Sequence, residues 1–161
     1  MKAAAVVLTL AVVIPHARIA ASQAATTPFT TTGAFIGVSV ADLGTSSRWY
    51  QEKFGLTVTM PPTGTPEARA TVLEGGGLTV ELMQHSRARP LRTAAPSVQA
   101  NYEIHGIFKA GFYVENFDRT LTELRRRGVE VAMGPFPKRD NQPANVILRD
   151  NAGNLLQLFG R

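Results

Sequence analysis

The chain has 161 residues, of which 44% are hydrophobic and 18% charged, and this composition is typical of one globular domain rather than of a disordered or integral membrane protein. The formal net charge is +5, but the two arginine clusters, 87–92 and 125–127, are not interleaved with aromatic side chains, so we expect no nucleic-acid binding. Because the chain has no cysteine, disulfides, thiolate metal sites and thiol nucleophiles are excluded.

The first 24 residues have the pattern of a secretory signal peptide. Lys2 precedes an apolar run from Ala3 to Ile14, which is shorter than the about 20 residues that span a bilayer. Ser22 and Ala24 then fit the rule of small residues before a cleavage site. We therefore expect residues 1–24 to be removed and residues 25–33 to form a flexible mature N-terminus. The mature protein would be periplasmic or secreted and would have no membrane anchor.

Residues 34–85 are predicted to form a first module of one strand, one helix and three further strands. Alternating apolar residues predict a strand over 34–40, and the helical spacing of Leu43, Ser47, Tyr50 and Phe54 predicts a helix that Gly55 ends. Three short strands are expected near 56–60, 69–74 and 78–84. We expect Pro61-Pro62-Thr63-Gly64 and Gly75-Gly76-Gly77 to separate these strands.

Residues 105–161 repeat this pattern as a second module. The segment from Gly111 to Phe117 aligns with the segment from Gly37 to Leu43, and Phe117, Leu121 and Leu124 mark a second helix that stops at Gly128. Further strands are expected near 129–132, 144–149 and 154–159. The linker between the modules, 86–104, is long, basic and irregular, which is typical of a disordered connection or of a lid over a site.

The alternation of residue types assigns each residue in the first and last strands of both modules to one of the two faces of the sheet. Aliphatic residues of one parity are expected to pack under the helices: Ile36, Val38, Val40, Leu78, Val80, Leu82, Ala110, Phe112, Val114, Leu156 and Leu158. The opposite parity mixes glycine, polar and aromatic residues: Phe35, Gly37, Ser39, Thr79, Glu81, Met83, Lys109, Gly111, Tyr113, Leu155, Gln157 and Phe159. Such a mixed face on a curved sheet is typical of a small-molecule cleft.

Several segments match the pattern of a known family. They are Val40-Ala41-Asp42-Leu43 with Ser46 and Trp49-Tyr50, Phe54-Gly55-Leu56, Val80-Glu81-Leu82, and the ending from Asp150 to Leu158. In these segments the sequence resembles the vicinal oxygen chelate superfamily, which includes glyoxalase I, extradiol dioxygenases and bleomycin-resistance proteins. In the ending, Asn151 and Gln157 stand where the family commonly has proline and glutamate. The resemblance implies an α+β fold in which two tandem βαβββ modules form a curved mixed sheet cup with helices on the outer face.

The resemblance also places the family's metal ligands at Phe35, Glu81, Lys109 and Gln157. Only Glu81 is a good ligand, because phenylalanine has no donor atom and a protonated lysine is itself a cation. His85 and His105 each lie four residues from one of these positions, about 13 Å along a strand at ~3.3 Å per residue, and a site built from both lacks a third ligand. We therefore expect no metal and no other cofactor.

Two functions follow from this site, and a third is less favoured. The first is metal-free binding of a small molecule, with Glu81 and Lys109 facing each other in the cup. The ligand would also contact Phe35, Ser39, Met83, Tyr113, Gln157 and Phe159. Trp49 is a further candidate, but a helical aromatic residue usually belongs to the core. The plain alternative for the two charges is mutual neutralisation.

The second function is catalysis of a lyase or isomerase type, with Glu81 as the general base and Lys109 stabilising a developing oxyanion. A metal-dependent glyoxalase or dioxygenase would need ligands from a second chain or a different strand register. The sequence leaves open whether the protein is a monomer or a homodimer.

Overall fold

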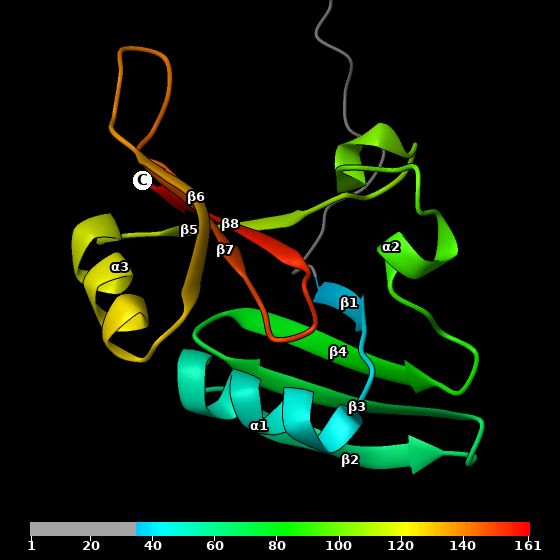
Figure 1. Ribbon diagram of the computed structural model, residues 1–161. Coiled ribbons are helices and arrows are strands. Elements are labelled where there is room, and N and C mark those ends of the chain that lie inside the picture. Colours follow the sequence, from blue (N-terminus) through cyan, green and yellow to red (C-terminus); the bar gives the residue numbers. More distant parts are fainter. Residues whose placement is uncertain (1–34) are drawn as a thin grey trace, which may run out of the picture. The chain divides into compact units, whose positions relative to one another are not determined.

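The strands and helices follow the order that the internal repeat predicts. A computed structural model describes residues 35–161 (Figure 1); the predicted signal peptide and flexible N-terminus lie outside the described residues. The first module contains β1 (Phe35–Ser39), α1 (Leu43–Phe54), β2 (Thr57–Gly64), β3 (Ala68–Gly75) and β4 (Leu78–His85). The second contains β5 (Ala110–Val114), α3 (Phe117–Arg126), β6 (Glu130–Phe136), β7 (Asn145–Arg149) and β8 (Leu155–Gly160).

Each module forms one four-stranded mixed sheet. The strand orders are β1-β4-β3-β2 and β5-β8-β7-β6, with the first and last strands of each module parallel and the other pairs antiparallel. No strand pairing joins the two sheets within residues 35–161. Helix α1 packs on β2, β3 and β4, and α3 packs on β8. The α+β fold of two tandem modules is confirmed.

The ends of both long helices agree with their sequence signals. The Asp42 side chain accepts a hydrogen bond from Thr45 N–H (2.7 Å), and Gly55 ends α1 in the left-handed region with φ 70°. The Gln84 side chain accepts a second bond from Leu43 N–H (2.8 Å), which ties the start of α1 to β4. In module two, Asn116 caps α3 by accepting from Arg119 N–H (3.0 Å).

The prediction that Pro61-Pro62-Thr63-Gly64 lies between the second and third strands is wrong. Strand β2 continues through these residues to Gly64, with irregular pairing to β3 between Val58 and Met60 and between Met60 and Thr63. The prolines are tolerated because β2 is an edge strand, where a missing N–H removes no necessary hydrogen bond. By contrast, Gly76 and Gly77 form the predicted turn between β3 and β4, both with positive φ.

One hydrophobic core serves both modules. Leu73, Val80 and Leu82 of the first sheet and Leu148, Leu156 and Leu158 of the second are buried in a single cluster. Helix α1 joins the two modules, because Phe54 lies edge-on to Phe112 of β5 (6.2 Å). Trp49 packs against Tyr50 and Phe54, so its place is in the core. No helix within residues 35–161 has the length and apolarity needed to cross a membrane.

The linker, 86–104, is less irregular than its sequence suggests. It contains the short helix α2 (Leu91–Ala94) and the 3-10 helix η1 (Asn101–Glu103). The Glu103 carboxylate accepts from Gln99 N–H (2.8 Å), and the Arg92 guanidinium donates to the Gln99 carbonyl (3.4 Å). These contacts fold the linker on itself.

Candidate functional site

The loop between β7 and β8 is fastened to α1 by a buried carboxylate. Asp150 is 4% exposed and accepts from the Tyr50 hydroxyl (2.9 Å), and its other bonds come from Ala152 N–H, Asn154 N–H and the Asn154 amide. Burial and the Asp150 charge raise the pKa of Tyr50, which therefore stays neutral. Asn151 adds a bond to the Ser46 hydroxyl (3.2 Å). The loop is thus held in place beside the linker.

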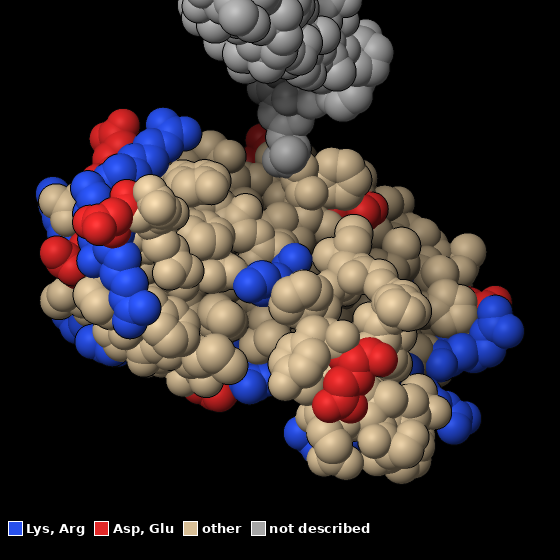
Figure 2. Space-filling model, turned by 90° about the horizontal axis from the view of Figure 1, so that it is seen from above, with Lys and Arg blue, Asp and Glu red and all other residues tan. Residues whose placement is uncertain are grey.

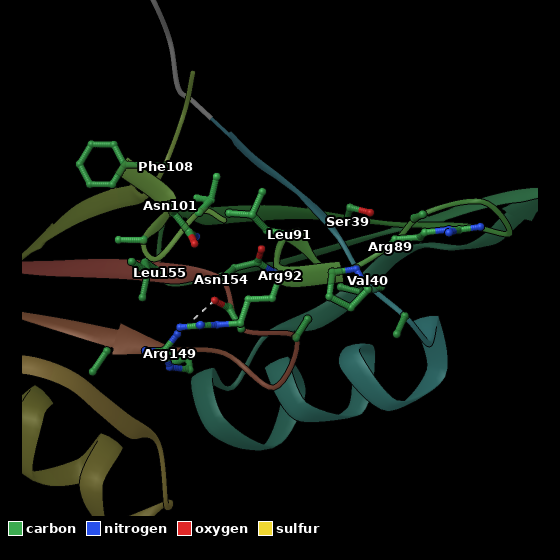
Figure 3. Close-up of a pocket in the computed structure, with 18 of the residues that line it drawn as sticks. Ser39, Val40, Arg89, Leu91, Arg92, Asn101, Phe108, Arg149, Asn154 and Leu155 are labelled. Atoms are coloured by element: carbon green, nitrogen blue, oxygen red, sulfur yellow. Dashed lines mark hydrogen bonds between the residues drawn. The ribbon is translucent and has the colours of Figure 1, made fainter. Parts of the chain in front are cut away.

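A pocket of about 850 Å³ lies where this loop, the linker and the ends of β1 and β4 meet (Figure 3). Module one contributes Ser39, Val40, Ala41, Gln84 and His85, and the linker contributes residues from Ser86 to Tyr102. Module two supplies Met133 of β6, Ile147 and Arg149 of β7, and the loop residues up to Leu155. Three segments that are far apart in the sequence therefore form its walls.

The pocket wall is basic and otherwise uncharged. Its charged members are Arg89, Arg92 and Arg149, and no aspartate or glutamate is among the lining residues. Polar groups come from Gln84, His85, Gln99, Asn101 and Asn154, and apolar surface comes from Val40, Leu91, Val98, Phe108, Ile147 and Leu155. The wall can therefore surround an apolar body and also bind a polar group.

Of the predicted ligand-binding residues, only Ser39 lines this pocket. Phe35 and Tyr113 are 65% and 60% exposed on the sheet faces, Met83 is exposed, and Tyr113 stacks on Phe159 (5.2 Å). Gln157 is buried, and its amide donates to Asn145 Oδ1 (2.9 Å). Apart from Ser39, the predicted ligand-binding residues are therefore not among the residues that line the pocket.

Glu81 and Lys109 are not brought together as an ion pair. Among residues 35–161 no salt bridge joins them, and Lys109 Nζ instead lies 5.0 Å from the centre of the Phe108 ring. Glu81 lies over Gly37, where its Oε2 would be 3.6 Å from an added Cβ. That the two charges face each other across the cup therefore stays a prediction.

The two histidines among residues 35–161 are also not part of a metal-binding arrangement. His85 Nδ1 accepts from Arg87 N–H (3.1 Å), its Nε2 lies 4.0 Å from Glu67, and His105 is exposed. Within the described part of the chain, no three side chains of the His, Cys, Asp and Glu types are grouped to hold an ion.

The fold and these residues can be compared with known proteins. The sequence of residues 33–158 matches the family model of the Glyoxalase/Bleomycin resistance protein/Dioxygenase superfamily. The chain belongs to this superfamily. The family expectation from the sequence is therefore confirmed, while no curated protein matches the chain as a sequence relative.

Several solved structures share the fold at low sequence identity. The glyoxylase/bleomycin resistance protein/dioxygenase domain from Frankia sp. EAN1pec has a TM-score of 0.63 at 19% identity, covering 83% of this chain and 94% of that one. A glyoxalase family protein from Enterococcus faecalis has a TM-score of 0.59 at 20% identity (81% and 96% covered). The fosfomycin resistance protein FosX from Listeria monocytogenes has a TM-score of 0.57 at 16% identity (81% and 94% covered).

Sequence reasoning did not single out the linker residues that line the pocket, nor the bonds of Asp150. The Asp150-Asn151-Ala152-Gly153-Asn154 segment carried the family resemblance, so the signal for a structured loop was present. The aspartate and asparagine are residue types that bond to their own loop backbone. For the linker, its arginines were the only signal.

Proposed function

We propose that this superfamily member binds a small organic molecule in the pocket between the linker and both modules. The observation that carries the proposal is the pocket itself, whose volume of about 850 Å³ is within the range of about 300–1,000 Å³ found for ligand sites. The wall combines apolar surface with a few polar groups, which supports the same conclusion. In ligand sites the apolar surface buries the ligand and the polar groups fix its orientation.

We further propose that binding needs no metal. The four side chains at the family's metal positions do not fit a divalent cation: Phe35 has no donor, and Lys109 carries a positive charge. Gln157 offers only a neutral amide, whose nitrogen donates to Asn145, and Glu81 is the single anionic side chain of the set. Zinc or nickel added to the protein should leave its melting temperature unchanged, whereas a rise that chelator reverses would contradict this part of the proposal.

Catalysis by Glu81 and Lys109 is the less supported alternative. General-base and oxyanion chemistry needs both groups within reach of one bound substrate, the base at the proton that it removes and the cation at the oxygen that becomes charged. Lys109 contacts Phe108, and no ion pair links it to Glu81 in the described residues. Turnover of any compound that Glu81→Gln abolishes while binding persists would support the enzyme over the binding protein.

Export is also part of the proposal, on the basis of the apolar run from Ala3 to Ile14 and the small residues before position 25. We propose that the mature protein acts in the periplasm or outside the cell. N-terminal sequencing of protein from its native source should begin at Ala25, and an intact Met1 would contradict cleavage.

The pocket is tested with a blocking variant and a matched control. Ala88 is exposed and lines the pocket, so Ala88→Trp should fill it without disturbing the core. Ala94 is an exposed linker alanine outside the wall, and Ala94→Trp places the same ring elsewhere. We expect a metabolite and drug library to contain compounds that raise the melting temperature of the wild type and of Ala94→Trp but not of Ala88→Trp.

Native mass spectrometry of the purified protein complements this screen. An excess over the denatured mass that equals an organic molecule is expected if the ligand is retained, and the same spectrum shows whether one or two chains are present. If no compound shifts the melting temperature, or if Ala88→Trp responds like the wild type, the proposed pocket is wrong.

A further inference from the structure

We infer that the pocket selects anionic ligands, namely small molecules with an apolar body and one carboxylate or phosphate group, and that Arg92 is the main residue that binds this group. This inference rests on the proposed function and specifies its ligand class. The lining residues include three arginines and no acidic residue. In Figure 3, Arg149 lies at one end of the pocket, Arg92 in the middle and Arg89 at the other end.

The three arginines differ in how far the protein already neutralises them. Arg149 donates to Glu130 Oε1 (2.9 Å) and contacts the Gly153 carbonyl (3.5 Å), so its charge is largely compensated. Arg92 has only a long bond to the Gln99 carbonyl (3.4 Å), and within residues 35–161 neither Arg92 nor Arg89 forms a salt bridge. Arg92 therefore keeps most of its five N–H donors available for a ligand.

The acidic residues near the pocket already have partners and are not themselves among its lining residues. Glu67 lies within 4.0 Å of His85 and Arg87, Glu130 pairs with Arg149, and Glu103 accepts from the Gln99 backbone. In the view of Figure 2, most Lys and Arg side chains lie toward the edges of the molecule, and one basic group near the centre lies among uncharged side chains. A concave wall with one sign of charge concentrates counter-ions, and a guanidinium binds carboxylate or phosphate oxygens in pairs.

The wall around Arg92 also defines the remainder of the ligand. Leu91, Phe108 and Leu155 contribute apolar surface, while the amides of Asn101 and Asn154 lie on the same wall (Figure 3). We expect these apolar groups to contact a flat hydrocarbon ring, and Arg92 to bind its acidic substituent. A zwitterion or a cation would find no carboxylate on the pocket wall.

Three probes with one ring system test the inference: 1-naphthoate, 1-naphthyl phosphate and the neutral 1-naphthamide, with Kd measured by isothermal titration calorimetry. We expect at least one of the two acids to bind at least about tenfold more tightly than the amide, as the loss of a charge-assisted hydrogen bond predicts. The acid that binds more tightly distinguishes a carboxylate site from a phosphate site. Binding should also weaken as salt rises.

Variants that remove one positive charge show which arginine binds the acidic group. Arg92→Gln should reduce the affinity for the acid by about tenfold or more and leave that for the amide unchanged, while Arg89→Gln should have a smaller effect. Arg125→Gln is the control, because it removes one positive charge from the exposed surface of α3 outside the pocket. Equal losses in Arg92→Gln and Arg125→Gln would show that only the net charge matters, which overturns the assignment of Arg92.

The outcomes separate this inference from the proposed function. If the amide binds as tightly as the acids and Ala88→Trp abolishes binding of all three, the pocket is correct and the anion preference is wrong. The same holds if neither acid binds while a neutral library compound stabilises the wild type and not Ala88→Trp. If no compound of any charge binds, the proposed function itself is wrong.

Discussion

At the scale of single residues, the bond between Tyr50 and Asp150 connects positions 100 apart in the chain. Tyr50→Phe removes the donor and keeps the ring, while Asp150 retains its bonds to Ala152 and Asn154. We expect the free energy of unfolding to fall by about 1.5–3 kcal/mol, the value typical of a hydrogen bond to a charged group. Urea denaturation measures it, and Tyr102→Phe, at an exposed tyrosine, is the control with a change below about 0.5 kcal/mol.

The same pair gives this prediction a second, pH-dependent readout. The folded state raises the pKa of Tyr50 above its ordinary value of 10.0, through burial and the Asp150 charge. A raised pKa contributes stability that is complete below pH 10 and is lost as pH rises further, because the unfolded chain then ionises first. Stability should decline more steeply above pH 10 in the wild type than in Tyr50→Phe. Parallel curves would contradict the role of this hydroxyl.

The internal repeat allows two equivalent glycines to be compared. Gly37 and Gly111 occupy the same position of their modules, but a Cβ on Gly37 meets Glu81 Oε2 at an ordinary 3.6 Å, whereas on Gly111 it meets the Phe159 ring at 3.3 Å. Gly37→Ala should therefore be neutral or stabilise by about 0.4–1 kcal/mol, because alanine restricts the unfolded chain. Gly111→Ala should be less stable than Gly37→Ala by about 1 kcal/mol. Thermal unfolding of the two variants would contradict this if their order were reversed.

At the scale of elements, the end of α3 is tied to the end of α1 through one exposed carboxylate. Glu123 accepts from Arg126 and Arg127 (2.7–2.8 Å), and Arg127 also donates to the Glu52 and Lys53 carbonyls at the end of α1. These bonds lower the pKa of Glu123 to about 2. The carboxylate thereby positions a guanidinium on carbonyls that a helix leaves without partners.

This network predicts a specific acid sensitivity. A lowered pKa contributes stability above the ordinary value of 4.5, and this stability is lost as pH falls from 4.5 to about 2. Glu123→Gln should flatten the decline of stability in that window, measured by urea midpoints at several pH values in low salt. Because Glu123 is at the surface, added salt should reduce the difference. Glu74→Gln, at an exposed glutamate without a salt bridge in the described residues, should leave the decline unchanged.

The elements themselves were largely predictable, because their signals are local. The Asp42 cap, the Gly55 stop and the apolar spacing between them set α1 at Leu43–Phe54. The prolines after Met60 misled because their effect depends on whether β2 is an edge strand, and strand order is not a local property. The short helices of the linker were not predicted for a similar reason. Its turns depend on side chains such as Glu103, which bonds to the backbone.

At the scale of the whole molecule, the wall of the pocket could not be predicted from the sequence pattern. Strand alternation correctly separated Val80 and Leu82 from the residues of the other face, such as Phe35 and Tyr113. It could not place the linker against the β7–β8 loop, because periodicity within a strand says nothing about segments between modules. The pocket lies at the ends of strands. Ser39, the last residue of β1, is the one predicted ligand-binding residue that lines it.

The shared core predicts that the two modules unfold together. Tyr50 and Arg127 each form a hydrogen bond to the other module, and buried leucines of both sheets belong to one cluster. Each module alone would therefore expose apolar surface that the other module now buries. The single tryptophan, Trp49, reports on module one, while far-UV circular dichroism reports on both. We expect coincident urea transitions from the two probes, the usual test of two-state unfolding.

Removing the polar contacts between modules makes this test sharper. The double variant Tyr50→Phe with Arg127→Gln should unfold at lower urea, but the two transitions should still coincide, because apolar contacts such as Phe54 on Phe112 remain. Arg125→Gln in place of Arg127→Gln controls for the loss of charge on α3. A tryptophan transition that separates from the circular dichroism transition already in the wild type would mean that the modules fold independently. The pocket between them would then depend on ligand binding for its geometry.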